Sequence, residues 1–418
     1  MSGLRAFDRE VDVLVVGAGP AGLAAAAVLG RVGAGSVEVV DRAGRAGGVP
    51  RLCDHVGFGL RDLRKAWRGT TYAEHRTALA LESGARLLTG VTVTGWSGER
   101  TLSLHGPGGG ERVRARAVLL ATGAAVRRPD WLPPAGPAGV WTTESLLRAI
   151  ATGTEGLSGR AVVVGAGLAA YAVVHALARS GVRTVAMLTD QPVPQASLAL
   201  DRAARLRWRF PLLTSTTVER VVGDARVESV ELRDSSGATR QIETDLVVIA
   251  GAGVPDPMLL APSGLDLDAG SHGPVVDGAN RTSLPGVFAA GTVVHPIEPA
   301  DVAALAGEHT GEAVLDWLSS QRWRPARGGV AVEVAAPLCW VTPGVVGPDS
   351  PRPPLNRFSL HSSDPLDRVA VEVRQDSRLL HTTTWHRVVP GRTLHLTSDW
   401  ASAVDPTGAT VRISLRPR

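Results

Sequence analysis

Cysteine is scarce in this chain of 418 residues, because Cys53 and Cys339 are the only two. They form no CxxC or CxxxxC pair and no set of four. This excludes a dithiol redox pair, a cysteine-held iron–sulfur cluster and a disulfide framework encoded in this chain. Two isolated thiols suit a reducing compartment, so we expect a cytoplasmic protein.

Lysine is scarcer still: Lys65 is the only one, and arginine supplies the rest of the positive charge behind a formal net charge of +4. The arginines alternate with acidic residues along the chain and build no long basic run. Nucleic-acid binding requires a clustered basic face, so we expect no nucleic-acid partner.

Long uninterrupted apolar segments are also missing. The longest apolar stretch runs from Val11 to Gly30, but Asp12 interrupts it and several glycines fall inside it. Neither a membrane span nor a signal peptide has this pattern, so we expect no membrane segment. Hydrophobic residues nevertheless make up 44% of the chain. This content and the length predict two or three domains with substantial cores.

A strand, a glycine loop, a helix and a second strand follow one another twice. An acid comes after each second strand, and an apolar strand ending in a small-residue turn trails each unit. The pattern predicts two mononucleotide-binding modules of the α/β class. The segments are 11–16, 17–22, 23–31, 36–40 and 117–123 in the first unit, and 160–164, 165–170, 171–180, 184–188 and 246–251 in the second.

The last part of the chain has a different character. A helix predicted over 301–319 and a linker rich in proline, glycine and arginine at 321–329 precede it. Apolar and polar residues then alternate in short segments, which is typical of strands with one buried face, so we expect an antiparallel β domain. The segments are 330–334, 357–360, 369–373, 393–396 and 410–414.

The first glycine loop has the pattern GxGxxG at Gly17, Gly19 and Gly22, and Asp41 ends the second strand. The first glycine permits a tight turn, the second lets the backbone approach a pyrophosphate, and the third lets helix and strand pack closely. The free N–H groups of the helix start favour an anion, and the acid accepts hydrogen bonds from ribose hydroxyls. The loop therefore predicts a dinucleotide site, with an empty glycine turn as the alternative.

The second loop has Gly165, Gly167 and Ala170 in the corresponding places. Alanine at the third place is tolerated by the fold. Asp190 would bond a ribose 2′-hydroxyl and repel a 2′-phosphate, which favours NAD(H) over NADP(H). A vestigial second site is the alternative.

Five motifs in this order resemble flavoproteins with two dinucleotide-binding domains, the relatives of glutathione and thioredoxin reductase. They are Gly17–Gly22, Asp41, Gly47–Gly48, Ala121–Gly123 and Gly286–Gly291. The resemblance implies an α/β fold with two Rossmann-like domains of the three-layer ββα type, FAD in the first and NAD(P)H in the second. The expected bounds are 1–125 with 255–320 for the FAD domain, 126–254 for the NAD(P) domain and 330–418 for the C-terminal β domain.

By the same resemblance, a set of glycines, small residues and acids binds the two cofactors. The set is Gly17, Gly19, Pro20, Ala21, Gly22, Asp41, Arg42, Gly47, Gly48, Val93, Ala121, Thr122, Gly123, Gly165, Gly167, Ala170, Asp190, Gly291, Thr292 and Asp301.

Residues 47–62 resemble more narrowly the FAD/NAD subunits of bacterial amino-acid-type dehydrogenases, such as hydrogen cyanide synthase, opine dehydrogenase and heterotetrameric sarcosine oxidase. The chain departs from these families in three ways. Cys53 stands alone where the disulfide reductases carry CxxxxC. The cysteine cluster of some dehydrogenase subunits is missing. Thr292 replaces the acid that ends the last FAD motif.

His55 and His295 are the candidate catalytic residues. His55 follows the double glycine, and His295 precedes the helix whose start, by the resemblance, points at the flavin. A histidine beside a flavin can donate a proton, and a structural role is the alternative for both. Arg51 and Glu298 are further polar candidates. Cys53 is expected to be a small buried residue, with a flavin-facing thiol as the alternative.

These observations predict an FAD-dependent oxidoreductase that moves a hydride between NAD(H), flavin and an organic substrate or partner protein, without a disulfide relay. One alternative is a non-catalytic or electron-relaying FAD/NAD subunit of a multi-component amino-acid-type dehydrogenase. Another is a degenerate flavoprotein fold that binds proteins. The expected partners are a small-molecule substrate and, in the first alternative, another subunit; a homo-oligomer is left open. The sequence does not identify the substrate, because the cofactor carries the chemistry.

Overall fold

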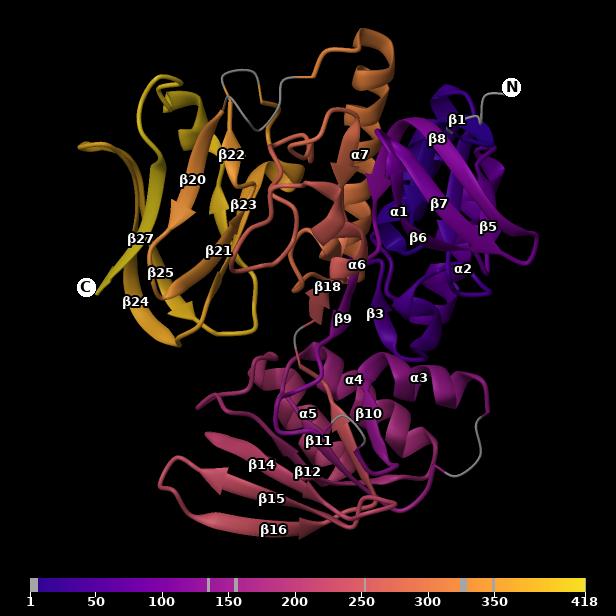
Figure 1. The fold of residues 1–418 in the computed structure, drawn as a ribbon. Coiled ribbons are helices and arrows are strands. Elements are labelled where there is room, and N and C mark those ends of the chain that lie inside the picture. Colours follow the sequence, from indigo (N-terminus) through magenta and orange to yellow (C-terminus); the bar gives the residue numbers. More distant parts are fainter. Residues whose placement is uncertain are drawn as a thin grey trace.

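The structure is a computed structural model that describes residues 7–133, 136–153, 157–251, 253–323, 329–347 and 350–417. Its elements form a first domain, a second domain and a C-terminal domain (Figure 1). The predicted fold class, two Rossmann-like domains followed by a β domain, is confirmed. No helix in the described ranges is long and apolar enough to cross a membrane.

The first domain is built on one sheet in the order β5-β2-β1-β8-β7-β6, and β19 pairs with the C-terminal half of β8. Strands β5, β2, β1, β8 and β19 are parallel, whereas β6, β7 and the first half of β8 form an antiparallel meander. The bounds are β1 Arg9–Val16, β2 Val37–Asp41, β5 Arg86–Thr89, β6 Thr92–Gly98, β7 Thr101–Gly106, β8 Gly109–Leu120 and β19 Val287–Ala289.

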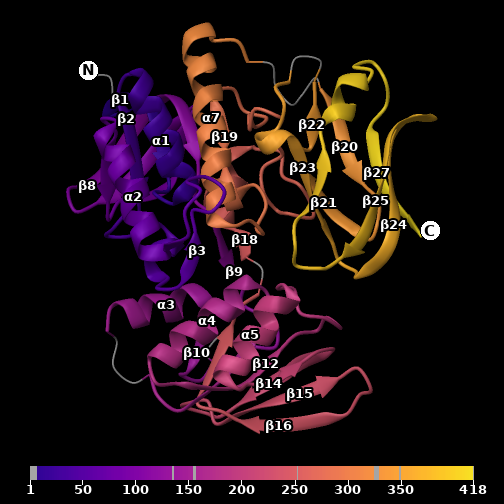
Figure 2. The ribbon, with the colours of Figure 1, turned by 180° about the vertical axis from the view of Figure 1, so that it is seen from behind.

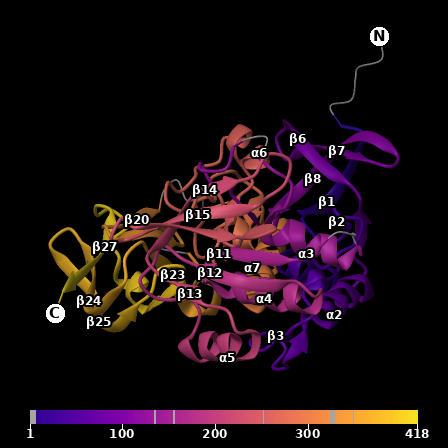
Figure 3. The same ribbon diagram turned by 90° about the horizontal axis from the view of Figure 1, so that it is seen from below.

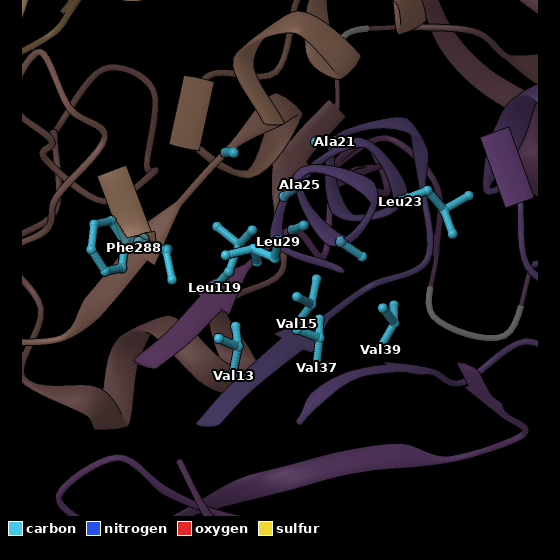
Figure 4. Close-up of a cluster of buried hydrophobic side chains, with 14 of the residues drawn as sticks. Val13, Val15, Ala21, Leu23, Ala25, Leu29, Val37, Val39, Leu119 and Phe288 are labelled. Atoms are coloured by element: carbon cyan, nitrogen blue, oxygen red, sulfur yellow. The ribbon is translucent and has the colours of Figure 1, made fainter. Parts of the chain in front are cut away.

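Alternate residues of β1 face two different layers. Val13 and Val15 lie in the core shared with helices α1 (Pro20–Val32) and α7 (Ala300–Ser320). Figure 4 shows this core between the strands and α1. Leu14 and Val16 lie in a second core with the meander. The period of two therefore produces the three layers, helices, parallel sheet and meander.

Small residues let α1 and α7 approach backbone to backbone. A Cβ atom added at Gly307 of α7 would lie 2.0 Å from the carbonyl oxygen of Ala21, and one added at Gly311 would lie 3.0 Å from Cβ of Val28. The alanine-rich sequence of α1 therefore has a packing reason as well as a helical one. This approach sets the position of the N-terminal ends of both helices.

The second domain repeats the three-layer plan. Its parallel sheet has the order β10-β17-β11-β12-β13, with helices α3, α4 and α5 on one face and the antiparallel sheet β14-β15-β16 on the other. The bounds are β10 Val140–Thr142, α3 Thr143–Ala151, β11 Arg160–Val164, α4 Leu168–Arg179, β12 Arg183–Leu188, α5 Leu198–Trp208, β13 Leu212–Leu213, β14 Thr216–Val222, β15 Ser229–Asp234, β16 Thr239–Glu243 and β17 Leu246–Ile249.

A two-stranded ribbon joins the first and second domains. Strand β9 (Ala124–Val126) leads into the second domain, and the antiparallel strand β18 (Gly253–Pro255) leads back. The predicted domain bounds stay a prediction, although both crossings lie close to them. The shorter elements are β3 Val56–Phe58, β4 Trp67–Arg68, α2 Gly69–Glu82 and α6 Pro257–Leu260, with one-turn helices at Val49–Leu52, Ala261–Ser263, Gly291–Val293, Pro354–Asn356 and Asp399–Ala403.

The C-terminal domain consists of two facing sheets with a core between them. The sheets have the orders β22-β20-β27-β24-β25 and β21-β23-β26. All pairs are antiparallel as predicted except β20 with β27, which is parallel. The bounds are β20 Val330–Val334, β21 Leu338–Thr342, β22 Val345–Val346, β23 Arg357–Ser362, β24 Leu366–Gln375, β25 Arg378–Val388, β26 Leu394–Thr397 and β27 Val411–Pro417.

Helix α7 lies between the first sheet and the C-terminal domain in both side views (Figures 1 and 2). From below, the second domain occupies the middle, with β1 and β2 to one side and β24 and β25 to the other (Figure 3). All three domains therefore meet near the N-terminal end of α7.

We predict that Gly307→Ala destabilises the protein although alanine is the better helix former. The new methyl group would meet a backbone oxygen at 2.0 Å. Overpacking of this kind costs about 1–3 kcal/mol, more than the ~1 kcal/mol gained in helix propensity. Urea unfolding measures the effect. Gly108→Ala is the control, because a Cβ atom there meets nothing within 4 Å. Equal stability of the two variants would contradict the close approach.

Candidate active site

One cavity of about 1650 Å³ lies where the three domains meet. The glycine loops of the first and second domains both line it, and so do residues of β23 and β26 from the C-terminal domain. Most of the predicted cofactor residues therefore face a single space. The exceptions are Gly22, Gly47 and Ala170, which do not line the cavity.

The first loop has the geometry that its glycines predict. Gly17 has φ +112° and no room for a side chain, because a Cβ atom would lie 2.3 Å from the carbonyl oxygen of Ala121. A Cβ atom at Gly22 would lie 1.9 Å from the carbonyl oxygen of Gly17. A Cβ atom at Gly19 would meet nothing within 4 Å. The loop is thus closed toward the protein and open toward the cavity at its middle glycine.

The start of α1 is not capped by a side chain. Gly19 is its N-cap, no side chain caps the helix, and its first turn has no acidic residue. The first N–H groups of a helix have no partner within it, so they remain available to a phosphate. These features fit the pyrophosphate of a dinucleotide.

Asp41 fixes the loop and faces the cavity. Its two carboxylate oxygens accept hydrogen bonds from the backbone N–H groups of Ala18 and Ala43, each at 2.7 Å. A carboxylate has about four acceptor positions, so two stay available for ribose hydroxyls. Arg42 next to it is exposed, and its guanidinium lies 3.8 Å from the carboxylate of Asp256.

The other first-site residues surround the same loop. A Cβ atom at Gly48 would lie 2.9 Å from Cα of Gly19. At Gly123, a Cβ atom would lie 3.5 Å from the hydroxyl oxygen of Thr292, so these two residues are neighbours in the cavity wall. The remaining predicted residues that line the cavity are Pro20, Ala21, Val93, Ala121, Thr122 and Gly291.

The second loop matches the first. A Cβ atom at Gly165 would lie 2.5 Å from the carbonyl oxygen of Ala250, whereas one at Gly167 would meet nothing within 4 Å. Gly167 is the N-cap of α4, which also lacks a side-chain cap and an acid in its first turn. Asp190 is exposed, and within the described ranges its carboxylate accepts one hydrogen bond, of 3.4 Å from the Thr189 hydroxyl. We call the space at each glycine loop a cradle: the first lies at Gly17–Gly22 and the second at Gly165–Ala170. The second cradle fits a dinucleotide and leaves the Asp190 carboxylate available to a ribose hydroxyl.

His55 lines the cavity at the junction of the first two domains. Its ring packs edge to face on His175 of α4, with 6.0 Å between ring centroids. The neighbouring Asp54 pairs with Arg179 of α4 at 3.2 Å. His55 thus lies between the two glycine loops. From the sequence, only its position after the double glycine was known.

His295 is buried behind the cavity wall and does not line it. Its ring stacks on Trp340 of β21 at 4.9 Å between centroids. Burial lowers the pKa of His295 to about 3, so the ring is neutral at physiological pH. These features favour the structural alternative, and the catalytic role of His295 stays a prediction.

Glu298 is the candidate that the structure strengthens. It lines the cavity, and its side chain is only 5% exposed. One carboxylate oxygen accepts a 3.4 Å hydrogen bond from Ser359, and the other, Oε2, has no partner. Burial raises the pKa of Glu298 to about 7 despite the nearby guanidiniums of Arg357 and Arg61.

Asp301, at the start of α7, is already bonded. Its carboxylate accepts hydrogen bonds from the backbone N–H of Arg61 at 3.0 Å and from the Arg61 guanidinium at 3.2 Å. Asp301 lines the cavity and holds Arg61 there, and its cofactor contact stays a prediction.

Sequence reasoning missed the cavity wall supplied by the C-terminal domain. Arg357 and His361 of β23 and His395 of β26 line the cavity. Burial lowers the pKa of His395 to about 4, so it is neutral at physiological pH. The period of two in β23 was a usable signal, since it places Arg357, Ser359 and His361 on one face.

Cys53 lines the cavity with little exposed area, and burial raises its pKa to about 12. Such a thiol stays protonated and is a poor nucleophile. Cys53 and Cys339 are both free. No group of three or more metal-binding side chains occurs in the part of the chain that the structure describes.

Known proteins resemble this chain in sequence and in fold. The family model described as pyridine nucleotide-disulphide oxidoreductase matches residues 11–307. A thioredoxin reductase of Treponema pallidum (strain Nichols) is 30% identical over 296 residues, which cover 69% of this chain and 90% of that protein. A ferredoxin–NADP reductase of Acidiphilium cryptum (strain JF-5) is 29% identical over 290 residues, 68% of this chain and 84% of that protein.

Two further similarities concern multi-component organisation and fold. An opine oxidase subunit of Agrobacterium tumefaciens (strain Ach5) is 26% identical over 346 residues, 72% of this chain and 63% of that protein. The crystal structure of T. acidophilum thioredoxin reductase superposes with a TM-score of 0.63 at 24% identity, over 75% of this chain and all of that chain. The C-terminal domain lies outside the family match.

We predict that Asp41→Ala weakens FAD binding about tenfold to a hundredfold, because a hydrogen bond to a charged group contributes about 1.5–3 kcal/mol. Asp41→Asn keeps one acceptor oxygen, so its affinity for FAD should lie between those of Asp41→Ala and the unchanged protein. Fluorescence titration of the flavin-free protein with FAD measures both. Asp130→Ala is the control, since its side chain is 91% exposed. Equal FAD affinity in all four proteins would remove Asp41 from the site.

We also predict that Glu298 makes the protein less stable as the pH rises toward neutrality. The folded protein keeps this proton up to a pKa of about 7, while the ordinary pKa is 4.5. A group whose pKa is raised by folding stabilises below its unfolded pKa, and this stability is lost as the pH rises through the folded pKa.

The thermal midpoint of Glu298→Gln should therefore rise relative to the unchanged protein between about pH 5 and pH 7. Comparison of the two proteins cancels the opposite trend from the buried neutral His295 and His395. A difference in midpoint that does not change with pH would show that Glu298 is ionised throughout.

Proposed function

Because the chain belongs to the pyridine nucleotide-disulphide oxidoreductase family and is an FAD- and NAD(P)-dependent oxidoreductase, we propose that it moves a hydride between NAD(H), flavin and an organic substrate. The observation that carries the proposal is that two uncapped helix starts, those of α1 and α4, open into one cavity. When bound, the flavin supplies two-electron chemistry that no side chain of this protein offers.

The first loop would hold FAD, and the second would hold the nicotinamide nucleotide. Gly19 admits the pyrophosphate of FAD, Asp41 bonds its ribose, and Thr292 supplies a neutral hydroxyl where relatives carry an acid. Gly167 and Asp190 play the corresponding parts for NAD(H). These roles rest on the open space at the middle glycine of each loop and on the uncapped starts of α1 and α4. They rest also on the acceptor positions that Asp41 and Asp190 keep available.

A protein thiol has no part in this proposal. Cys53 is buried, and its Sγ donates only to the carbonyl oxygen of Val49 at 3.6 Å. Cys339 lies in β21 of the C-terminal domain, where its Sγ donates to the carbonyl oxygen of Pro337. The relay of the disulfide-reducing relatives needs two neighbouring thiols, which these positions do not provide.

A second candidate is an electron-relaying component of a larger dehydrogenase. The similarity to the opine oxidase protein favours it, since that protein is by name one subunit of a larger enzyme. The third alternative, a degenerate fold, lacks such support, because both glycine cradles keep the geometry for a pyrophosphate.

We predict that NADH bleaches the bound flavin of the isolated chain under anaerobic conditions and that NADPH does so at least about tenfold less efficiently. The Asp190 carboxylate would repel a 2′-phosphate in the cleft. Asp190→Ser should narrow the difference, whereas Asp224→Ser, at an exposed bend, should not change it.

Anaerobic absorbance measurements decide between the candidates. Faster bleaching by NADPH would contradict the role of Asp190. Tight NADH binding without bleaching would favour the electron-relaying component, and binding of neither nucleotide would indicate a vestigial second site.

A further inference from the structure

The sheet β21-β23-β26 turns a polar face toward the first domain. Phe358 and Leu360 of β23 lie in the core of the C-terminal domain. Arg357, Ser359 and His361 alternate with them and point the other way. Ser359 reaches Glu298 of the first domain, so this face looks onto the loop that precedes α7.

His395 extends the same face. It stands directly opposite Ser359 in the antiparallel pair β23–β26, while its neighbours Leu394 and Leu396 pack with the core. Directly opposite residues share a face of the sheet. Arg357, His361 and His395 all line the cavity. We call the part of the cavity between these residues and Glu298 the C-terminal chamber.

Glu298 brings to this chamber a hydrogen-bond acceptor that lacks a donor. Among the described residues, its buried Oε2 has no hydrogen-bond partner, and its Oε1 accepts one bond, of 3.4 Å from Ser359. His295 lies 3.8 Å from Oε1 on the other side, and its lowered pKa keeps it uncharged. A buried polar atom without a partner is costly, so a bound ligand with a hydrogen-bond donor would relieve the cost.

Arg357 brings a cation to the same chamber. In the described ranges no hydrogen bond or salt bridge holds its partly buried guanidinium, and the carboxylate of Glu298 attracts it through space. Arg61, the other guanidinium nearby, is held by Asp301 at 3.2 Å. Arginine pairs with carboxylates through two parallel N–H bonds, which makes a free guanidinium in a cavity a receptor for such an anion.

Residues in the wall of the C-terminal chamber contact both other domains. The Arg392 guanidinium donates to the carbonyl oxygens of Gln195 and Ala196 in the second domain. The Thr393 hydroxyl donates to the carbonyl oxygen of Ile297 in the first. These contacts favour a small molecule over a polypeptide segment as the occupant.

We propose that the C-terminal chamber binds the organic substrate, and that this substrate is a small carboxylate with an amine or hydroxyl group next to the carboxyl. Arg357 pairs with the carboxylate, and Glu298 Oε2 accepts the hydrogen bond of the amine or hydroxyl. The inference rests on the proposed function, because it names the substrate class for that oxidoreductase. The chamber opens into the same cavity as both cradles, so the substrate needs no second entrance.

Calorimetric titration of the FAD-loaded protein tests this proposal with matched probes. L-lactate and L-alanine carry both groups, propionate carries only the carboxylate, and propionamide carries neither charge nor hydroxyl. We expect lactate or alanine to bind most tightly, propionate to bind more weakly, and propionamide not to bind. A change in the flavin absorbance spectrum on binding would place the probe near the cofactor.

Two variants separate the two contacts. Arg357→Gln should weaken binding of all three carboxylates about tenfold to a hundredfold. Glu298→Gln should reduce the advantage of lactate and alanine over propionate and leave propionate binding largely unchanged. Arg412→Gln and Glu333→Gln are controls, because both side chains are exposed and outside the cavity. The flavin content of each variant checks that the fold is kept.

Several outcomes would overturn the proposal. One is no binding of any carboxylate at the highest soluble concentration, and another is equal loss in the control variants. Binding of propionamide as tight as that of propionate would exclude a charge-based site. Bleaching by NADH without added carboxylate reports the proposed function separately, so either idea can fail without the other.

Discussion

The close approach of α7 to α1 is the constraint on which the rest of the structure depends. Gly307 has no room for a side chain because the carbonyl oxygen of Ala21 occupies the place of its Cβ atom. Gly291 is likewise limited by Ala21, at 2.9 Å. These contacts bring the start of α1, the turn at Thr292 and the start of α7 to one spot. The first cradle exists because three segments far apart in sequence converge there.

The same convergence shapes the cavity, in a chain that has only two cysteines. Cys53 and Cys339 are both free, and burial raises the pKa of Cys53 to about 12. The wall is instead completed by the C-terminal domain, which contributes Arg357 and His395 and contacts both other domains. The Arg357 guanidinium and the buried Glu298 carboxylate, which attract each other, are groups suited to a polar small molecule rather than to a disulfide.

Local sequence was sufficient for the two glycine loops, because a strand, a turn and a helix are encoded by adjacent residues. The predicted first helix began at Leu23, and the observed α1 begins at Pro20, since proline suits the first helical turn. The burial of His295 could not be predicted locally, because it depends on Trp340, which lies in another domain. Arg357 and His395 were missed because only the pairing of β23 with β26 and the docking of their sheet bring them to Glu298.

We infer that this oxidoreductase works through one cavity and without a protein thiol. Anaerobic stopped-flow reduction of the bound flavin by NADH tests this in the protein with both Cys53→Ser and Cys339→Ser. We expect a rate constant within about twofold of that of the unchanged protein, since neither thiol takes part in the reaction. Loss of reduction while the flavin stays bound would instead restore a thiol mechanism.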